Sequence, residues 1–280
     1  MSHPPLPPIP TIHLFPVLDQ HLLELLASLS PAQWELPTLA PQWRVRDVAL
    51  HLLDGNLRTL SMLRDGYFGQ QPGGFSYGEI VAFLNQLNAD WVRAGQRLSP
   101  GVIRWLLAVS GPEYCRYLAG LDPWAPAAFA VAWAGEAESP NWFHIARDYT
   151  EKWHHQQQIR QAVGQEQPLL SRELYQPFLA TCLRALPYHY RSVPAAPGQV
   201  VAFTITGEAQ KTWYLRRAVN AWELEQQYSG PLSASVTIDG AVAWRLFTKS
   251  LPREVAQAYM QLEGEPRLGE PVFDLLTVMA

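Results

Sequence analysis

Hydrophobic residues recur at helical spacing through much of the chain. In residues 11–30, 45–65, 76–98, 100–121 and 171–188 they fall three and four positions apart, which predicts a helix in each range. Ser76 and Glu79 have the spacing of a capping box, which favours a helix start there. Residues 122–138 are rich in Ala and Pro, and we expect an extended strand or a loop.

The longest uninterrupted helical pattern covers residues 139–163. Ser139 is a suitable N-cap, and Pro140 suits the first helical position. Gly164 follows the last periodic residue and suits a left-handed C-terminal stop. The pattern therefore predicts one helix of roughly six turns with no internal Gly or Pro.

Four polar residues of this helix fall at i, i+4, i+7 and i+11, namely His144, Asp148, Glu151 and His155. At about 100° per residue they form one narrow stripe. Glu151 and His155 are one turn apart, so a carboxylate and an imidazole can bind the same metal ion. The alternative is that the stripe is the solvated face of an amphipathic helix.

The pattern changes after Pro194 and Pro197, in the segment SVPAAPGQ that we interpret as a linker. Residues 200–206, 212–219, 221–227 and 233–239 alternate or cluster in the manner of strands. Short helices are predicted at residues 241–248, 252–261 and 271–279. The fold class is therefore mainly α, with a helical bundle in residues 1–190 and a small α+β domain in residues 198–280.

Composition excludes several classes of protein. The formal net charge of −4 argues against nucleic acid as the main partner, because phosphate binding needs a basic face. No run of 18 apolar residues predicts a membrane span, and the Pro-rich start MSHPPLPPIP is expected to be a short extended arm, not a signal peptide. Cys115 and Cys182 fall inside helical patterns and are predicted to be reduced core thiols, as in a cytoplasmic protein.

A metal site needs a ligand from a second element, and His51 is the candidate. Asp47, His51, Asp54 and Arg58 form a stripe on the helix predicted at residues 45–65. If two neighbouring helices bring His51 opposite Glu151 and His155, three protein ligands with open positions suit a catalytic ion. The alternative is a boundary histidine with no ligand role.

Several segments resemble a known family. The segment WRVRD at residues 43–47, followed by His51, resembles the W-x-V-x-D-x-x-x-H segment of the DinB-like metal-binding superfamily, and within it the mycothiol-dependent maleylpyruvate isomerase type. Residues 147–160, RDYTEKWHHQQQIR, resemble the later ligand helix of that type. VTIDGAVAWRLFTKSLP and LLTVMA are similar to its sterol-carrier-like second domain. The resemblance implies metal ligands at His51, Glu151 and His155.

The resemblance also implies a reaction. A divalent ion, zinc first and otherwise nickel, iron or manganese, would activate a low-molecular-weight thiol such as mycothiol or bacillithiol. The thiol would add to a small electrophilic substrate, giving an isomerase or a thiol S-transferase. Arg216 or Arg217 would hold a substrate carboxylate, and His144 and Asp148 would line the pocket or orient a ligand. A monomer or a homodimer is expected.

Two other functions remain open at this point. Metal-bound water would make the protein a hydrolase, and Asp148 or His144 would then have to serve as the base. A structural ion would instead leave a non-catalytic protein that binds small molecules in an apolar cleft.

Overall fold

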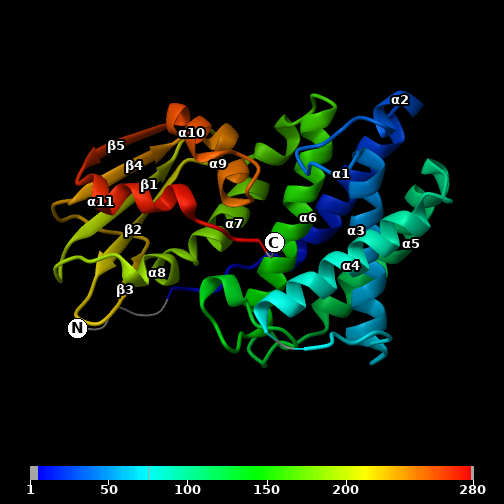
Figure 1. The fold of residues 1–280 in the computed structure, drawn as a ribbon, viewed down its shortest axis with the longest axis horizontal. Helices are drawn as coiled ribbons and strands as arrows, with labels where there is room; N and C mark the ends of the chain where they lie inside the picture. Colours follow the sequence, from blue (N-terminus) through cyan, green and yellow to red (C-terminus); the bar gives the residue numbers. More distant parts are fainter. Residues whose placement is uncertain (1–5, 75, 279–280) are drawn as a thin grey trace. The chain divides into compact units, whose positions relative to one another are not determined.

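A computed structural model describes residues 6–74 and 76–278. The chain folds into two compact units. The first unit contains residues 11–128 and 151–166, and the second contains residues 6–10, 129–150 and 167–278 (Figure 1). The predicted class, a helical region followed by an α+β region, is confirmed. The expected domain boundary between residues 190 and 198 stays a prediction.

The first unit is helical. Its elements are α1 (Phe15–Ser28), α2 (Pro31–Trp34), α3 (Val45–Thr59), α4 (Tyr77–Gly95) and α5 (Pro100–Ala119). Helix α3 packs against both α4 and α5, and α1 packs against α5. Buried apolar side chains from α1, α3 and α5, among them Leu25, Val48, Leu53 and Ile103, form its core. Among the described residues no helix is both long and apolar enough to cross a bilayer.

The ends of these helices largely follow the sequence signals. Pro16 lies in the first turn of α1, and Ser76 and Glu79 form the predicted capping box of α4. The helix predicted over residues 45–65 is one element with two geometries. Its α-helical part ends at Thr59, and Leu60–Arg64 continues as a π-helical turn before Gly66 adopts a positive φ of 69°.

Helix α6 (Asn141–Ala162) is the long predicted helix, and it passes from the second unit into the first at residue 151. It begins one residue later than expected, and the carbonyl of Pro140 accepts from the backbone N–H of His144 at 3.2 Å. The Ser139 hydroxyl accepts from the N–H of Val131 and donates to Glu136. Gly164, with φ of 72°, provides the predicted stop.

The polar stripe of α6 is not a solvated face. Every residue from 141 to 160 is buried or half-buried. Polar side chains such as Gln156 and Gln157 are 1% and 0% exposed. Buried polar groups require partners, and this is the environment in which a metal-ligating stripe is expected.

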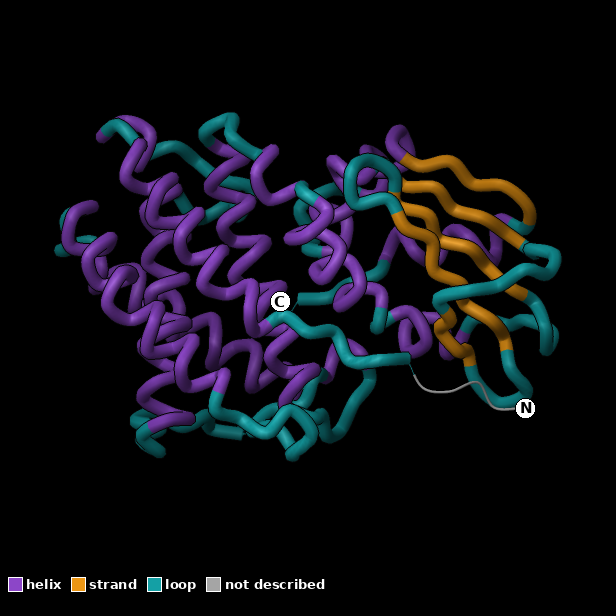
Figure 2. Tube along the Cα trace, turned by 180° about the vertical axis from the view of Figure 1, so that it is seen from behind, coloured by secondary structure: helices purple, strands orange, loops and turns teal. Residues whose placement is uncertain are grey.

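The second unit is built on a five-stranded sheet of order β3-β2-β1-β4-β5, drawn in orange in Figure 2. The strands are β1 (Val200–Ile205), β2 (Lys211–Arg217), β3 (Trp222–Glu225), β4 (Ala234–Ile238) and β5 (Met260–Gly264). Strands β1 and β4 pair in parallel, and the other pairs are antiparallel. The four strands predicted from the sequence are confirmed.

The fifth strand corrects the prediction of a helix over residues 252–261. Only α10 (Arg253–Ala256) and a 3-10 turn at Gln257–Tyr259 are helical there. In β5, Met260 and Leu262 are half-buried whereas Gln261 and Glu263 are exposed, which is the period of two typical of an edge strand. The helix predicted at residues 271–279 is likewise short, because a 3-10 turn covers only Glu270–Asp274, and Met279 lies outside the described residues.

Helices that precede residue 190 pack with this sheet unit. The helix predicted over residues 171–188 is divided into α7 (Arg172–Leu183) and α8 (Leu186–His189). The hydroxyl of Tyr175 on α7 donates to the carbonyl of Gly240 at 2.8 Å, at the start of α9 (Gly240–Phe247). The ring of Tyr190 packs edge-on against Phe203 of β1 and Trp222 of β3. Helix α11 (Pro266–Gly269) follows β5.

Candidate metal centre

Three of the residues singled out in the sequence lie together in the first unit. His51 comes from α3, and Glu151 and His155 come from α6. Each offers a ligand atom, and these atoms all lie within 4.8 Å of one another. Nε2 of His155 is 3.5 Å from a carboxylate oxygen of Glu151. Among the described residues, this is the group of His, Cys, Asp and Glu side chains spaced to hold a metal ion.

Aromatic contacts hold the two imidazoles close. The ring centroids of His51 and His155 are 4.5 Å apart and meet edge-on. The indole of Trp43 lies 4.8 Å from the ring of His51 and 5.9 Å from that of His155. Trp43, itself half-buried, therefore packs beside both imidazoles.

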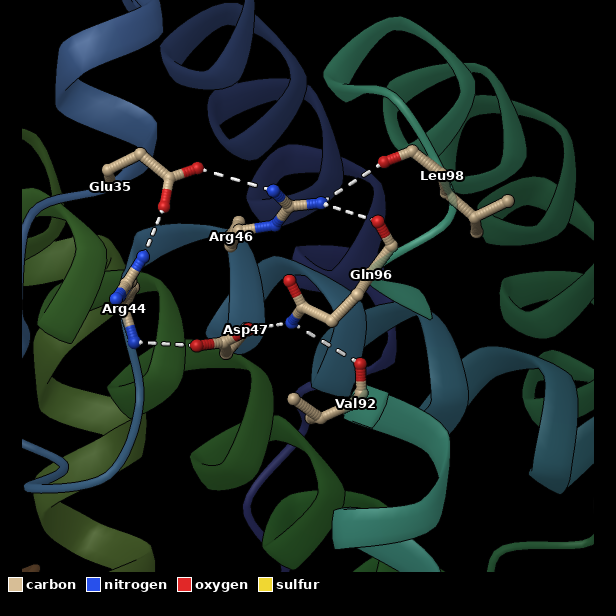
Figure 3. Close-up of polar contacts among 7 residues, drawn as sticks. All are labelled: Glu35, Arg44, Arg46, Asp47, Val92, Gln96 and Leu98. Carbon is tan, nitrogen blue, oxygen red and sulfur yellow. Dashed lines mark hydrogen bonds and ion pairs between the residues drawn. The ribbon is translucent and has the colours of Figure 1, made fainter. Parts of the chain in front are cut away.

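The start of α3 is fixed by Asp47, one turn before His51. One oxygen of Asp47 accepts from the backbone N–H of Arg44 at 3.0 Å, and the other accepts from the amide of Gln96 at 2.8 Å (Figure 3). The first bond caps the helix, and the second ties it to the end of α4. The aspartate of the WRVRD segment thus has a structural role. It fixes the start of α3, and with it the position and rotation of the helix that carries His51.

A second set of hydrogen bonds and ion pairs supports the start of α3. The guanidinium of Arg46 donates to Glu35 at 3.2 Å and to the carbonyl of Leu98 at 3.2 Å (Figure 3). Glu35 also pairs with Arg44 at 2.6 Å, and the Arg44 contact holds the pKa of the Glu35 carboxyl below its usual value. Exposed pairs of this kind contribute little to stability, but they orient the segment that carries Trp43.

Gln158 orients the imidazole of His155. Its side-chain oxygen lies 2.9 Å from Nδ1 of His155, and the amide is 5% exposed. An amide oxygen can only accept, so Nδ1 carries the proton and donates. The lone pair of the imidazole is then on Nε2, the nitrogen that faces Glu151.

Replacing Gln158 with leucine is expected to weaken zinc binding about tenfold or more, because the partner that fixes the tautomer and the ring is lost. Gln158→Glu, which keeps an acceptor, should bind zinc at least as tightly as the wild type. Competition with a chromophoric chelator measures both affinities. Equal affinities for wild type and Gln158→Leu would show that the hydrogen bond has no such role.

The electrostatics of the cluster suit a cation. Burial lowers the pKa of His51 well below its ordinary value, the electrostatic interaction with His155 lowers it further, and Glu151 opposes this. His51 is therefore neutral at pH 7, which is the form that binds metals. Its Nδ1 is shielded from solvent and has no hydrogen-bond partner among the described residues. Two imidazoles and one carboxylate fit a divalent ion such as zinc.

His144 and Asp148 do not belong to this group of donor atoms. Both lie in the part of α6 that belongs to the second unit. Nε2 of His144 is 3.8 Å from Asp148, and Arg147 pairs with Asp148 at 2.7 Å. Burial lowers the pKa of His144, so its ring is neutral at pH 7. Their expected role as pocket or orienting residues stays a prediction.

The two candidate arginines of β2 differ in their surroundings. Arg216 pairs with Glu223 and with Glu225, each at 2.5 Å. Arg217 has a buried Nε with no hydrogen-bond partner in the described part of the chain. Both line a pocket of about 410 Å³ beside the β2–β3 turn. The guanidinium of Arg216 is thus already neutralised, whereas that of Arg217 retains an unused donor.

Trp43, Asp47 and Gln158 support the cluster, although the sequence pattern predicts no separate role for them. Trp43 and Asp47 were part of the WRVRD motif. Gln158 had one available signal, since it lies at i+3 from His155 on a helix predicted to carry metal ligands. Its contact could be recognised only after the imidazole had been placed.

Comparison with known proteins agrees with this architecture. The family model described as mycothiol maleylpyruvate isomerase N-terminal domain matches residues 15–160, just over half of the chain. The chain therefore belongs to this family. No curated protein is significantly similar to it in sequence.

Among solved structures, a mutant form of the mycothiol-dependent maleylpyruvate isomerase is similar to the chain, with a TM-score of 0.51 and 13% identity. The match covers 86% of this chain and 88% of that chain, so the two share a fold. The structure titled as the isomerase itself has a TM-score of 0.48, 12% identity and the same coverage.

Proposed function

We propose that the protein is a metal-dependent enzyme that activates a low-molecular-weight thiol, such as mycothiol or bacillithiol, toward a small electrophile. The reaction we favour is addition of the thiol to a conjugated cis double bond, rotation about the resulting single bond, and expulsion of the thiol to give the trans isomer. The cluster of His51, Glu151 and His155 in a member of the maleylpyruvate isomerase family carries this proposal. A divalent ion at these residues supplies a positive charge that lowers the pKa of a bound thiol.

The chain's own residues prepare this site in three ways. Burial keeps His51 neutral, so that its ring can bind a cation at pH 7. Gln158 holds the lone pair of His155 toward Glu151. Trp43 packs beside both imidazoles, and an apolar neighbour strengthens the attraction between the ligands and a cation.

The chain has no suitable thiol of its own for this chemistry. Burial and the neighbouring carboxylate of Asp19 raise the pKa of Cys115 to about 11. Cys182 is 1% exposed and belongs to the second unit. A thiol with such a high pKa is almost entirely protonated at pH 7 and is a poor nucleophile. These observations support a thiol that is supplied from solution.

For the substrate carboxylate predicted from the family resemblance, Arg217 is the better of the two β2 candidates. Arg216 already binds two carboxylates, whereas Nε of Arg217 has no partner among the described residues. A guanidinium with an unused donor can take a carboxylate without breaking an existing ion pair.

The test is an assay of maleylpyruvate isomerisation by purified, zinc-loaded protein, with and without mycothiol. We expect one zinc per chain, and turnover that requires both the metal and the thiol. Turnover that persists after chelation of the metal would refute metal dependence. Hydrolysis of ester or amide substrates without any thiol would favour the hydrolase, and zinc loss that unfolds the chain would favour a structural ion.

A further inference from the structure

A glycine interrupts the stripe of α3 that carries His51. Gly55 lies one turn beyond His51, in the interior of the helix and with an ordinary helical φ. The backbone therefore does not need glycine here, and glycine weakens a helix interior relative to alanine. Apart from its chain neighbours and the helix's own nearby backbone, no heavy atom of the described residues lies within 4 Å of the position that a Cβ would occupy, although Gly55 is half-buried. A space is thus kept open beside His51.

Arg58 lies on the same stripe of α3, seven residues after His51 and three after Gly55. Long side chains on a helix lean toward its N-terminus, and Arg58 does so, since its guanidinium is 3.6 Å from Asp54 one turn earlier. Gly55 and His51 lie on the same stretch of the helix surface, three and seven residues before Arg58.

The guanidinium of Arg58 has an unused donor. Its side chain is 26% exposed, yet Nη1 is shielded from solvent and has no hydrogen-bond partner in the described chain. The ion pair with Asp54, at 3.6 Å, is longer than a hydrogen bond. A buried N–H without a partner is costly, so such a group in a folded protein calls for an explanation.

We propose that the α3 face from His51 to Arg58 is a binding seat for a carboxylate of the substrate. Arg58 donates to the carboxylate, and Gly55 leaves the room that the carboxylate occupies. One guanidinium can serve two carboxylates, as Arg216 does with Glu223 and Glu225 in this chain, so Asp54 need not be displaced. The proposal rests on the proposed function, because it places the substrate beside the metal centre.

The test uses zinc-loaded protein and maleate, a small cis dicarboxylate, with binding measured by titration calorimetry. We expect Arg58→Leu to weaken maleate binding at least tenfold and to leave zinc affinity unchanged. Arg93→Leu is the matched control, because Arg93 is also a helical arginine paired with an aspartate, Asp90, but is 79% exposed. Gly55→Leu should fill the open space and weaken maleate binding without any loss of charge.

The outcomes separate this proposal from the one on which it rests. If the wild type binds no zinc, the proposed metal centre fails. If zinc binds but maleate does not, or if maleate binds Arg58→Leu and Gly55→Leu as tightly as the wild type, the seat is wrong and the metal centre is untouched. Thermal unfolding of each variant confirms that it is folded, and Gly55→Leu keeps the test decisive should Arg58→Leu fail to fold.

Discussion

Replacing His51 with alanine is expected to weaken zinc binding by more than about a hundredfold. Loss of an outer partner of a ligand already costs roughly tenfold to a hundredfold in metal affinity, and His51 offers a ligand atom itself. The variant leaves Glu151 and His155 on a single helix, one turn apart. Two donors from one element hold a divalent ion much less well than three donors from two elements. Thiol-dependent turnover should be lost in parallel.

The measurement is zinc affinity by competition with a chelator, together with circular dichroism to show that the variant is folded. His13→Ala is the matched control, because His13 is an exposed histidine of the same unit and lies outside the cluster. Its zinc affinity should equal that of the wild type. A folded His51→Ala protein with full zinc affinity would remove the basis of the proposed function.

Cys115 is expected to react about a hundredfold more slowly with iodoacetamide at pH 8 in the folded protein than in the unfolded chain. Its pKa of about 11, against 9.0 for the unperturbed group, lowers the thiolate fraction by roughly this factor. The pH dependence has a definite sign. In the folded protein the rate should rise about tenfold per pH unit up to pH 10, whereas in the unfolded chain it should level off above pH 9.

Peptide-resolved mass spectrometry separates Cys115 from Cys182 in this experiment, and urea-unfolded protein is the reference. Rapid alkylation of Cys115 in the folded protein at pH 8 would contradict the raised pKa. It would also reopen the possibility that the chain supplies its own thiol nucleophile.

The elements that carry the site were predictable because their signals are local. The spacing of apolar residues predicted α3 and α6. The one-turn spacing of Glu151 and His155 predicted that they could bind the same ion. The need for a ligand from a second element pointed to His51, and the family resemblance supported it. The meeting of these three side chains depends on the packing of α3 against α6, and only the structure shows it.

Spacing on a helix could not settle the role of two further residues. His144 and Asp148 continue the stripe of Glu151 and His155, but α6 passes from one compact unit to the other at residue 151. Helical periodicity describes the rotation of side chains about one axis and does not report which elements surround each turn. The single stripe therefore has two different environments.

Arg216 and Arg217 could not be separated from the sequence for a related reason. Neighbouring residues of a strand point to opposite faces of a sheet, but the sequence does not tell which of the two finds acidic partners. Which one is neutralised depends on the partner strand. The register places Glu223 opposite Arg216 and Trp222 opposite Arg217, and this pairing is a property of the folded sheet.

The contact of Tyr175 with Gly240 bears on how the protein can be shortened. A chain that stopped at residue 190 would retain α7 but lose the carbonyl of Gly240 and the N–H of Trp244, both of which bond to the hydroxyl of Tyr175. It would also expose the ring of Tyr190, which packs on Phe203 and Trp222. Such a fragment would expose an apolar surface and would tend to aggregate in solution. Protein purified for metal-binding experiments should therefore include the whole second unit.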